Sequence, residues 1–524
     1  MAIKILQIGQ EDWQNHIQMP KGIEWSYSSL SDLETVLENE TVELLKKGNA
    51  TLGAPSEPTL QYQAILITSD IADEASLSLL DDVVDPYAVF FLDGIPLPQA
   101  SDKGFLRKKM ARTLPFDGEK EEIVCYLEKN LFRGQYGAKL KISDIDLHPS
   151  FDGKVTHFGY VSLNFDGNFG KDFEPLFTYR YNVPSSTVAL EFWQEYTVTG
   201  NSEIAIEVTS FVAGSVYDIQ ETRLISGDEL KKPFILNTEE EQYYYSFSIL
   251  ARGQGKISFG PLHYRNSRQG LGQFILGGER FADSQRQEFI SYFEPGDMKP
   301  PLNVYFSGYR SAEGFEGYFM MKDMKSPFLL IGDPRLEGGS FYGGSSELED
   351  AIEDKIASSL DYLGFSSNDL IFSGLSMGTF GALYYASSFN PAAVIVGKPF
   401  ASLGNTTKAL KLRRPNEFET MADVTLSLTG GTDEEHIELL NQKFWSKFDK
   451  SDFPNTDFAI AFMEDDDYDG TATEELIEHL SSKASHIYAK GYPGRHNDNS
   501  PAINKWFLKQ YSTILADKFG RKTK

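Results

Sequence analysis

The chain has 524 residues, of which 41% are hydrophobic and 13% aromatic, so it contains enough apolar material for two or three buried cores and is not intrinsically disordered. Lys and Arg number 49 against 76 Asp and Glu, and the net charge of −27 repels nucleic acid and phosphate-rich membrane surfaces. We therefore expect no nucleic-acid partner.

The single cysteine, Cys125, excludes an intramolecular disulfide and a thiolate metal cluster. Its surroundings, EEIVCYLEKN, predict a packed position on a helix. The N-terminal MAIKILQIGQEDW lacks the long apolar core and cleavage site of a signal peptide, and no later stretch approaches the ~18 apolar residues of a membrane-spanning helix. These features predict a soluble cytoplasmic protein.

Residues 1–138 predict a small α/β domain. The short apolar runs at 3–9, 61–70 and 87–94 are typical of strands, and the pattern at 72–83 is typical of a helix. Because the runs are apolar throughout, we expect strands that are buried on both faces.

Residues 139–275 predict an antiparallel, jelly-roll-like β-sandwich, because bulky and polar residues alternate at 187–198, 202–213 and 243–253 with turn residues between them. Such a domain can bind a partner, or a glycan through exposed aromatic side chains. The candidates for a glycan surface are Trp193, Tyr196, Tyr243 and Tyr245. The simpler interpretation is that these side chains pack in the core or across strands.

Residues 276–524 predict an α/β-hydrolase-like domain with a mostly parallel, doubly wound sheet, because strand and helix patterns alternate. No sharp marker fixes the domain boundary within residues 270–300. The predicted strands cover 302–309, 327–333, 369–374, 392–399, 458–463 and 486–492, and the predicted helices cover 345–364, 378–389 and 499–519.

Ser376 is the candidate nucleophile. It lies in GLSMG, a G-x-S-x-G pattern that by itself often arises by chance. Here an apolar strand precedes the serine and a small-residue helix follows it, which is the context of a nucleophile elbow. Gly374 and Gly378 leave room for the sharp turn, and the helix N-terminus favours negative charge that develops at the serine. The alternative is a tight strand–helix turn without chemistry.

His496 is the candidate base, since a serine hydroxyl needs a base to become a nucleophile. In α/β hydrolases the chain order is Ser, acid, His, and three histidines follow Ser376 near the chain end. His479 lies in a helical pattern and His486 begins a strand, whereas His496 lies in the loop GYPGRHNDNS after a strand. The alternative for His496 is a solvated loop residue.

The acid that orients this histidine is expected in the run EDDDYDG, residues 464–470, after the preceding strand. Asp465, Asp466, Asp467 and Asp469 are all candidates, and spacing alone selects none of them.

The oxyanion hole is expected to use the backbone N–H of Met377, the residue after the nucleophile, and that of Gly308 or Tyr309 in the loop after an earlier strand.

The loop DPRLEGGSFYGG, residues 333–344, is a candidate for substrate binding. Gly338 and Gly339 would let the backbone approach a ligand closely, and Arg335 would hold an anionic or polar group. The alternative is a flexible surface loop.

Five segments together resemble the accessory Sec system protein two family: ILQIGQEDW, GDPRLEGGSFYGG, SGLSMGTFGALYYA, AFMEDDDYD and GYPGRHND. The resemblance covers the whole chain. It implies Ser376 as nucleophile, His496 as base and Asp466 as acid. The family acid can be a glutamate, so Asp466 departs in side-chain length, and Glu464 and Asp467 stay open.

The resemblance also implies a role in the export of serine-rich repeat adhesins and in O-acetylation of N-acetylglucosamine on the glycosylated adhesin. The implied partners are that adhesin, accessory Sec proteins one and three, the accessory motor ATPase and the accessory channel. The implied location is the cytoplasm, with a peripheral place at the membrane through the export complex as a further option. No metal and no bound cofactor are expected, although an acetyl donor is required, and no Gly-rich phosphate loop identifies it.

Three hypotheses therefore stand. The chain is an acetyltransferase that also supports export, a non-enzymatic export adaptor with a relic triad, or a carboxylesterase.

Overall fold

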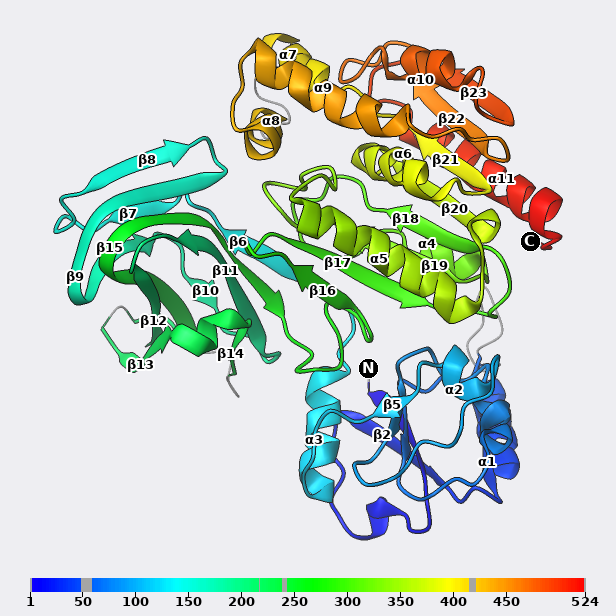
Figure 1. The fold of residues 1–524 in the computed structure, drawn as a ribbon. Coiled ribbons are helices and arrows are strands. Elements are labelled where there is room, and N and C mark those ends of the chain that lie inside the picture. The colour runs from blue at the N-terminus through cyan, green and yellow to red at the C-terminus, as the bar shows by residue number, and fades with distance from the viewer. Residues whose placement is uncertain (1, 49–58, 216, 238–242, 414–420, 523–524) are drawn as a thin grey trace. The chain divides into compact units, whose positions relative to one another are not determined.

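The computed structural model describes residues 2–48, 59–215, 217–237, 243–413 and 421–522 (Figure 1). They form two compact units. The first comprises Met1–Gly134, Ser267–Gly278 and Glu294–Met298, and the second comprises Gln135–Asn266, Glu279–Phe293 and Lys299–Lys524. The described strands form three sheets, and the second and third sheets belong to the same unit. None of the helices within the described ranges is long and apolar enough to cross a membrane.

A parallel five-stranded sheet forms the centre of the first unit, in the order β2-β1-β3-β4-β5. Ile65 and Ile67 enter one apolar core, whereas Ala64 and Leu66 of the same strand enter another, so the sheet is buried on both faces as predicted. The elements are β1 (Ile3–Ile8), η1 (Trp13–Asn15), β2 (Ile23–Ser28), α1 (Leu33–Gly48), β3 (Ala64–Ile67), η2 (Glu74–Leu80), β4 (Val89–Phe91), α2 (Phe105–Lys108), β5 (Arg112–Thr113) and α3 (Lys120–Asn130).

The helix-like pattern at 72–83 contains the 3-10 helix η2. One local prediction in this unit needs correction. Cys125 does lie on a helix, α3, but it is exposed, while its neighbours Val124 and Tyr126 are buried. The helix turns its apolar stripe inwards at Ile123, Val124, Tyr126 and Leu127, and the cysteine falls outside that stripe.

A ten-stranded, antiparallel sheet opens the second unit and wraps around one apolar core. Its central strand β15 runs for 24 residues and pairs with β9 through several register shifts, which bend both strands. The elements are β6 (Gly137–Leu140), β7 (Ile145–Leu147), β8 (Lys154–Phe158), β9 (Ser162–Tyr179), β10 (Val183–Pro184), β11 (Leu190–Val198), β12 (Glu203–Val212), β13 (Ile219–Ser226), η3 (Gly227–Lys231), β14 (Phe234–Leu236) and β15 (Tyr243–Asn266).

The aromatic side chains proposed for glycan binding belong largely to the packing of this sheet. Tyr245 is buried in its core, and Tyr196 packs against that core. Trp193 is only 5% exposed, and the guanidinium carbons of Arg280 and Arg286 lie 4.0 and 3.6 Å from the centre of its ring. The packing interpretation therefore describes these three residues, and Tyr243 is half-buried.

An eight-stranded sheet completes the second unit, in the order β16-β17-β19-β18-β20-β21-β22-β23. Strands from β18 to β23 pair in parallel, and β16 and β17 form an antiparallel hairpin. The elements are β16 (Glu279–Ala282), β17 (Glu288–Glu294), β18 (Leu302–Phe306), α4 (Tyr318–Asp323), β19 (Phe328–Gly332), α5 (Ser346–Leu363), η4 (Ser367–Asp369), β20 (Leu370–Leu375), α6 (Met377–Phe389), β21 (Ala393–Gly397), α7 (Leu403–Arg413), α8 (Met421–Thr429), α9 (Glu434–Phe448), β22 (Asp457–Met463), α10 (Ala472–Leu480), β23 (His486–Tyr492) and α11 (Ser500–Phe519).

Helices cover both faces of this sheet, and neighbouring residues of β20 show it. Phe372 packs against Phe389 of α6, while the hydroxyl of Ser373 accepts a hydrogen bond of 2.6 Å from Tyr511 of α11. Because successive strand residues point to opposite faces, α6 and α11 lie on opposite sides. The mixed α/β architecture is as predicted.

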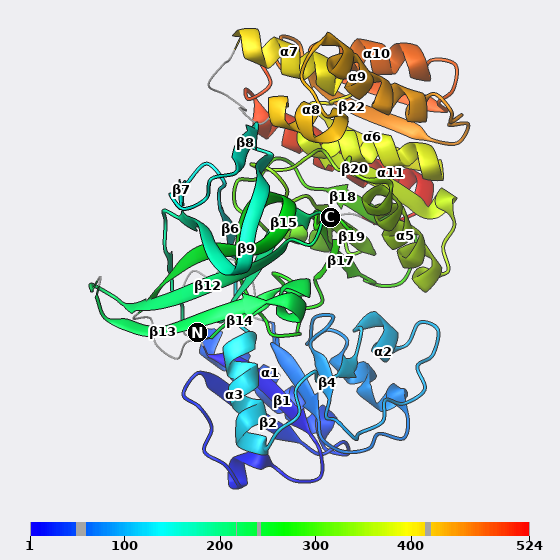
Figure 2. The same cartoon turned by 60° about the vertical axis from the view of Figure 1, so that its left-hand side comes forward.

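Two parts of the unit were not predicted. The hairpin β16–β17 occupies the segment in which a domain boundary was expected, and all seven residues of β17 are buried. The helices α7, α8 and α9 fill the connection between β21 and β22. The turn after β8 reaches this helical insertion, since the N–H of Tyr160 donates to Asp423 of α8 at 2.9 Å (Figure 2).

Candidate active site

Ser376 occupies a sharp turn between β20 and α6. Its φ of 51° lies in the left-handed region, which is uncommon for a residue with a side chain. A Cβ at Gly374 would stand 2.3 Å from the backbone of Gly378, and one at Gly378 would stand 2.0 Å from the carbonyl oxygen of Phe306. Both glycines are therefore required by close backbone contacts, as the elbow pattern predicted.

Ser376, His496 and Asp466 come together at the carboxyl edge of the eight-stranded sheet. Ser376 Oγ lies 2.9 Å from His496 Nε2, and His496 Nδ1 lies 2.9 Å from Asp466 Oδ2. The three residues follow β20, β23 and β22, and parallel strands bring their carboxyl ends to one edge. The distances are those of a hydroxyl–imidazole–carboxylate chain.

His496 is only 2% exposed and is enclosed by aromatic rings. The ring of Tyr468 stacks on the imidazole at 4.3 Å between centroids, and the ring of Phe400 lies at 5.1 Å. Both aromatic residues were missed from the sequence. Tyr468 lies inside the acidic run and Phe400 follows β21 in the segment GKPF, so their positions after strands were the available signal.

The acidic run divides its tasks among its members. Asp466 contacts the imidazole, and Asp467 accepts the backbone N–H of His496 at 3.1 Å. Asp469 instead accepts the backbone N–H groups of Ala401 and Ser402, both at 2.8 Å. Burial raises the pKa of Asp469 to about 7, although these two N–H groups oppose the rise. Of the open candidates, Asp466 is the one beside the ring.

The predicted oxyanion donors differ in their surroundings. Met377 is the first residue of α6, and a first-turn N–H has no acceptor within its own helix. The N–H of Gly308, in contrast, donates to Glu316 Oε2 at 2.6 Å. In this conformation Gly308 is therefore engaged by a carboxylate, and Met377 and Tyr309 stay as the predicted donors. Glu316 was not anticipated from the sequence.

Arg335 binds a buried carboxylate of the protein, whereas the sequence predicted that it would bind an anionic or polar group of a ligand. It is 2% exposed, and its Nε and Nη2 donate to Asp333 at 2.8 and 2.6 Å. Burial would raise the pKa of Asp333, but Arg335 and two backbone N–H groups hold it below its ordinary value. The pair is structural because both charges are buried and matched.

The two glycines of this loop do require close approach, but to protein groups. A Cβ at Gly338 would stand 2.2 Å from the ring of Tyr309, and one at Gly339 would stand 2.5 Å from Sδ of Met377. Both glycines have φ near +130°, a conformation that favours glycine. The loop therefore packs against the two remaining predicted oxyanion donors.

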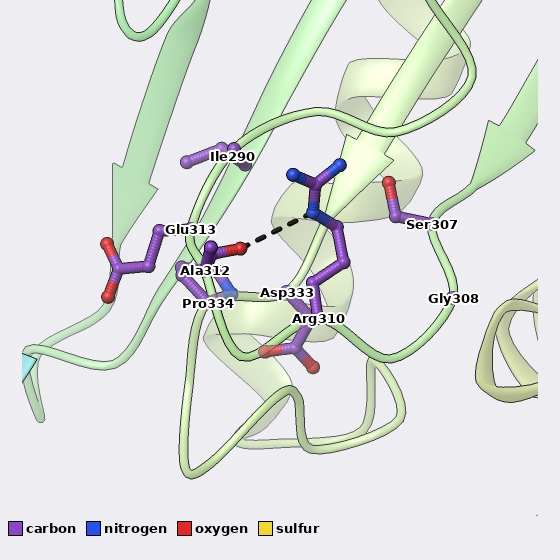
Figure 3. Close-up of a pocket in the computed structure, with 9 residues that line it drawn as sticks. Ile290, Ser307, Gly308, Arg310, Ala312, Glu313, Asp333 and Pro334 are labelled. Atoms are coloured by element: carbon purple, nitrogen blue, oxygen red, sulfur yellow. Dashed lines mark hydrogen bonds between the residues drawn. The ribbon is translucent and has the colours of Figure 1, made fainter. Parts of the chain in front are cut away.

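A small pocket lies beside the loop that follows β18 (Figure 3). Arg310 crosses it and donates from Nε to the carbonyl oxygen of Ala312 at 3.3 Å. The carboxylates in its lining, Glu313 and Asp333, are both paired with cationic side chains. We assign no ligand to this pocket.

A second buried histidine, His263, lies in the same unit and was also missed. Its Nδ1 lies 2.6 Å from Glu313 and its Nε2 lies 2.8 Å from Glu195. Arg265 pairs with Glu313 and with Glu288, and Arg280 also pairs with Glu288, so three cationic side chains, His263 included, balance the three carboxylates. The spacing of His263, Glu288 and Glu313 would also suit a metal ion. Arg265, however, already donates hydrogen bonds to the carboxylates of Glu288 and Glu313.

Comparisons with known proteins identify one family over nearly the whole chain. A family model described as accessory Sec system GspB-transporter matches residues 3–521. Accessory Sec system protein two of Staphylococcus aureus (strain NCTC 8325 / PS 47) is 42% identical over 99% of this chain and 97% of its own length. The protein of the same name from Streptococcus gordonii is 37% identical over 99% of both.

A solved structure is similar to this chain over nearly its whole length. A chain of the Glycosylation Associate Protein (Gap123) complex from Streptococcus agalactiae superposes with a TM-score of 0.92 at 39% identity, over 99% of each chain. With these matches, the chain belongs to the accessory Sec system protein two family.

Proposed function

We propose that this protein is a serine-dependent O-acetyltransferase of α/β-hydrolase type that modifies N-acetylglucosamine on serine-rich repeat adhesins and also supports their export. The observation that carries the chemistry is the chain of contacts from Ser376 through His496 to Asp466. The family supports the export role, because its model is described as a GspB-transporter.

The first half-reaction would form an acetyl-enzyme. With its Nδ1–H donating to Asp466, His496 presents Nε2 as an acceptor and removes the hydroxyl proton as Ser376 attacks the donor's carbonyl carbon. Negative charge develops on the carbonyl oxygen, near the N-terminus of α6 and the N–H of Met377. When the carbonyl re-forms, the donor's leaving group departs with the proton from His496.

The second half-reaction would transfer the acetyl group to the sugar. His496 removes the proton of the sugar hydroxyl as this oxygen attacks the acetyl-serine ester, and the same proton then returns to Ser376 Oγ. The ester bond to serine breaks as the ester bond to the sugar forms. The result is an O-acetylated glycan and the free enzyme.

The proposed setting is an export complex in the cytoplasm or peripheral to the membrane. The relative from Streptococcus agalactiae was solved within the Gap123 complex, which supports partnership with accessory Sec proteins one and three. We further propose the motor ATPase, the channel and the glycosylated adhesin as partners. The first unit and the antiparallel sheet lie outside the triad and offer surface for such partners.

The test combines the purified full chain, an activated acetyl ester as donor and an N-acetylglucosamine glycopeptide as acceptor. Wild type should carry one acetyl group on Ser376 and should pass it to the glycopeptide, as mass spectrometry of both would show. Ser376→Ala should lose both signals, with a rate loss of roughly 10⁶-fold, because the covalent route is removed.

Two outcomes would favour the alternatives. Release of free acetate that is indifferent to acceptor would indicate a carboxylesterase. Unchanged adhesin acetylation in cells that carry Ser376→Ala would indicate an export adaptor with a relic triad. If acetylation is lost while export continues, the two tasks are separate functions of one chain.

A further inference from the structure

Lys398 directly follows β21 and reaches into the loop that carries His496. The residue is only 6% exposed. Its φ of 61° lies in the left-handed region, and its backbone N–H donates to the carbonyl oxygen of Ala461 on β22 at 2.8 Å. The backbone of Lys398 is therefore fixed against the strand that leads to Asp466.

The ammonium group of Lys398 has three acceptors in one short segment. It donates to the carbonyl oxygen of His496, to that of Asp498 at 3.0 Å and to Oγ of Ser500 at 3.0 Å. An ammonium group has three protons, so these acceptors satisfy it fully. The contacts extend from His496 itself to Ser500, the first residue of α11.

His496 is consequently held on both sides of its own backbone. Its N–H donates to Asp467, and its carbonyl oxygen accepts from Lys398. The carboxylate of Asp466 and the ring of Tyr468 then fix the imidazole. Rotation of the loop would carry Nε2 away from Ser376 Oγ.

A buried ammonium is a costly way to anchor a loop. Burial lowers the pKa of Lys398, which reflects the unfavourable transfer of its charge from water. An apolar side chain of similar length would avoid that cost but could not bind carbonyl oxygens. The three contacts to one loop therefore indicate that this loop must be held in a fixed position.

We propose that Lys398 is a positioning residue for acyl transfer, which holds the His496 loop so that the imidazole meets Ser376. The proposal rests on the proposed function, because it assigns Lys398 to the base of that reaction. It adds a fourth side chain on which turnover depends.

Lys518 provides a matched control at the opposite end of β21. Its ammonium donates to the carbonyl oxygens of Ala392 and Asn455 at 2.9 and 3.2 Å and pairs with Asp457 at 3.0 Å, far along the strand from the triad. Lys398→Met and Lys518→Met thus each remove an ammonium that donates to backbone carbonyl oxygens, one at each end of β21.

The experiment measures kcat, KM and urea unfolding of the full chain with an activated acetyl ester. Lys398→Met should lower kcat roughly 10- to 100-fold, because displacement of a catalytic group by about 1 Å has effects of that size, while KM changes little. Lys398→Arg keeps a cationic donor and should recover part of kcat. Lys518→Met should lose stability but keep the wild-type kcat per folded molecule.

Wild-type kcat in Lys398→Met, or an equal loss of kcat in Lys518→Met, would overturn the proposal. Should Lys398→Met fail to fold, Ser500→Ala removes one acceptor and should give a smaller loss of kcat at unchanged KM. Wild-type kcat in Ser500→Ala would then count against the positioning role. Ser376→Ala separates the two proposals, since activity in that variant overturns the proposed function itself.

Discussion

The second unit buries two histidines among carboxylates, and they differ in the partner of one ring nitrogen. His496 has Asp466 at Nδ1 and the hydroxyl of Ser376 at Nε2. His263 has carboxylates at both nitrogens, Glu313 and Glu195. Carboxylates accept hydrogen bonds, so His263 must donate from both nitrogens and be charged, whereas His496 can present a lone pair to a hydroxyl.

The electrostatics of the second cluster follow from this difference. Burial alone would lower the pKa of His263, but Glu313 and Glu195 raise it to about 9. Burial would raise the pKa of Glu288, yet Arg265, His263 and Arg280 hold it well below its ordinary value. A buried histidine–carboxylate contact therefore indicates a base only when the other nitrogen faces a group that can lose a proton.

The largest expected effect separates the two histidines by one matched substitution. His496→Gln should lower kcat roughly 10⁶-fold, because a triad acts as a unit. His263→Gln should keep kcat per folded molecule and lower the free energy of unfolding by about 3–5 kcal/mol, because it removes the cation between the buried carboxylates Glu195 and Glu313. Turnover and urea unfolding are measured on both. A kcat loss in His263→Gln without loss of stability would contradict the structural role of His263.

The next effect concerns two neighbouring carboxylates, one beside the ring of His496 and one beside its backbone N–H. Asp466→Asn should lower kcat roughly 10⁴-fold, because the amide no longer stabilises the imidazolium or fixes its tautomer. Asp467→Asn is the control, since Asp467 contacts the backbone N–H of His496 and not its ring. It should retain far more activity. Equal losses in both variants would mean that Asp466 has no special role.

A smaller effect is the pH dependence of stability. The pKa of His263 is raised from 6.5 to about 9. Its contribution to the free energy of unfolding is therefore complete below about pH 6.5 and is lost as the pH rises through 9. The loss should approach about 3 kcal/mol. The pKa values of Glu288 and Glu313 are lowered, so their contribution is present above the ordinary value of 4.5 and is lost on acidification.

The measurement is urea unfolding between pH 5 and pH 10, a range that covers the pKa of His263 in the folded and the unfolded chain. His263→Gln should lose the alkaline part of the slope, whereas His496→Gln should retain it. If both variants follow the wild-type curve above pH 6.5, His263 is not the group responsible.

The smallest expected effect uses a residue outside both clusters. Cys125 lies on α3 in the first unit and is exposed. Its alkylation under native conditions should go to completion and should leave kcat and the free energy of unfolding unchanged. Cys125→Ser provides the unlabelled control. Protection of the thiol until unfolding would contradict the exposed position.

Features that depend on neighbours along the chain could be predicted from the sequence. The apolar run before Ser376, the two glycines around it and the helix after it are local, and they predicted the elbow that the structure contains. The order of Ser376, the acidic run and His496 followed from strand–helix alternation, because each follows a strand of one parallel sheet. The family resemblance, now supported over residues 3–521, was carried by the same local motifs.

Which side chains contact one another could not be predicted in this way, because it depends on the three-dimensional fold. Asp466 and its neighbours have the same charge and similar spacing, and the turn after β22 places Asp466 beside the imidazole. The sequence predicted a ligand-binding role for Arg335, whereas its side chain pairs with Asp333 in the interior. Lys398 is 98 residues from His496, and Arg265 is 48 residues from Glu313. Such contacts depend on sheet register and on burial, which sum over the whole fold and have no periodic signal in the chain.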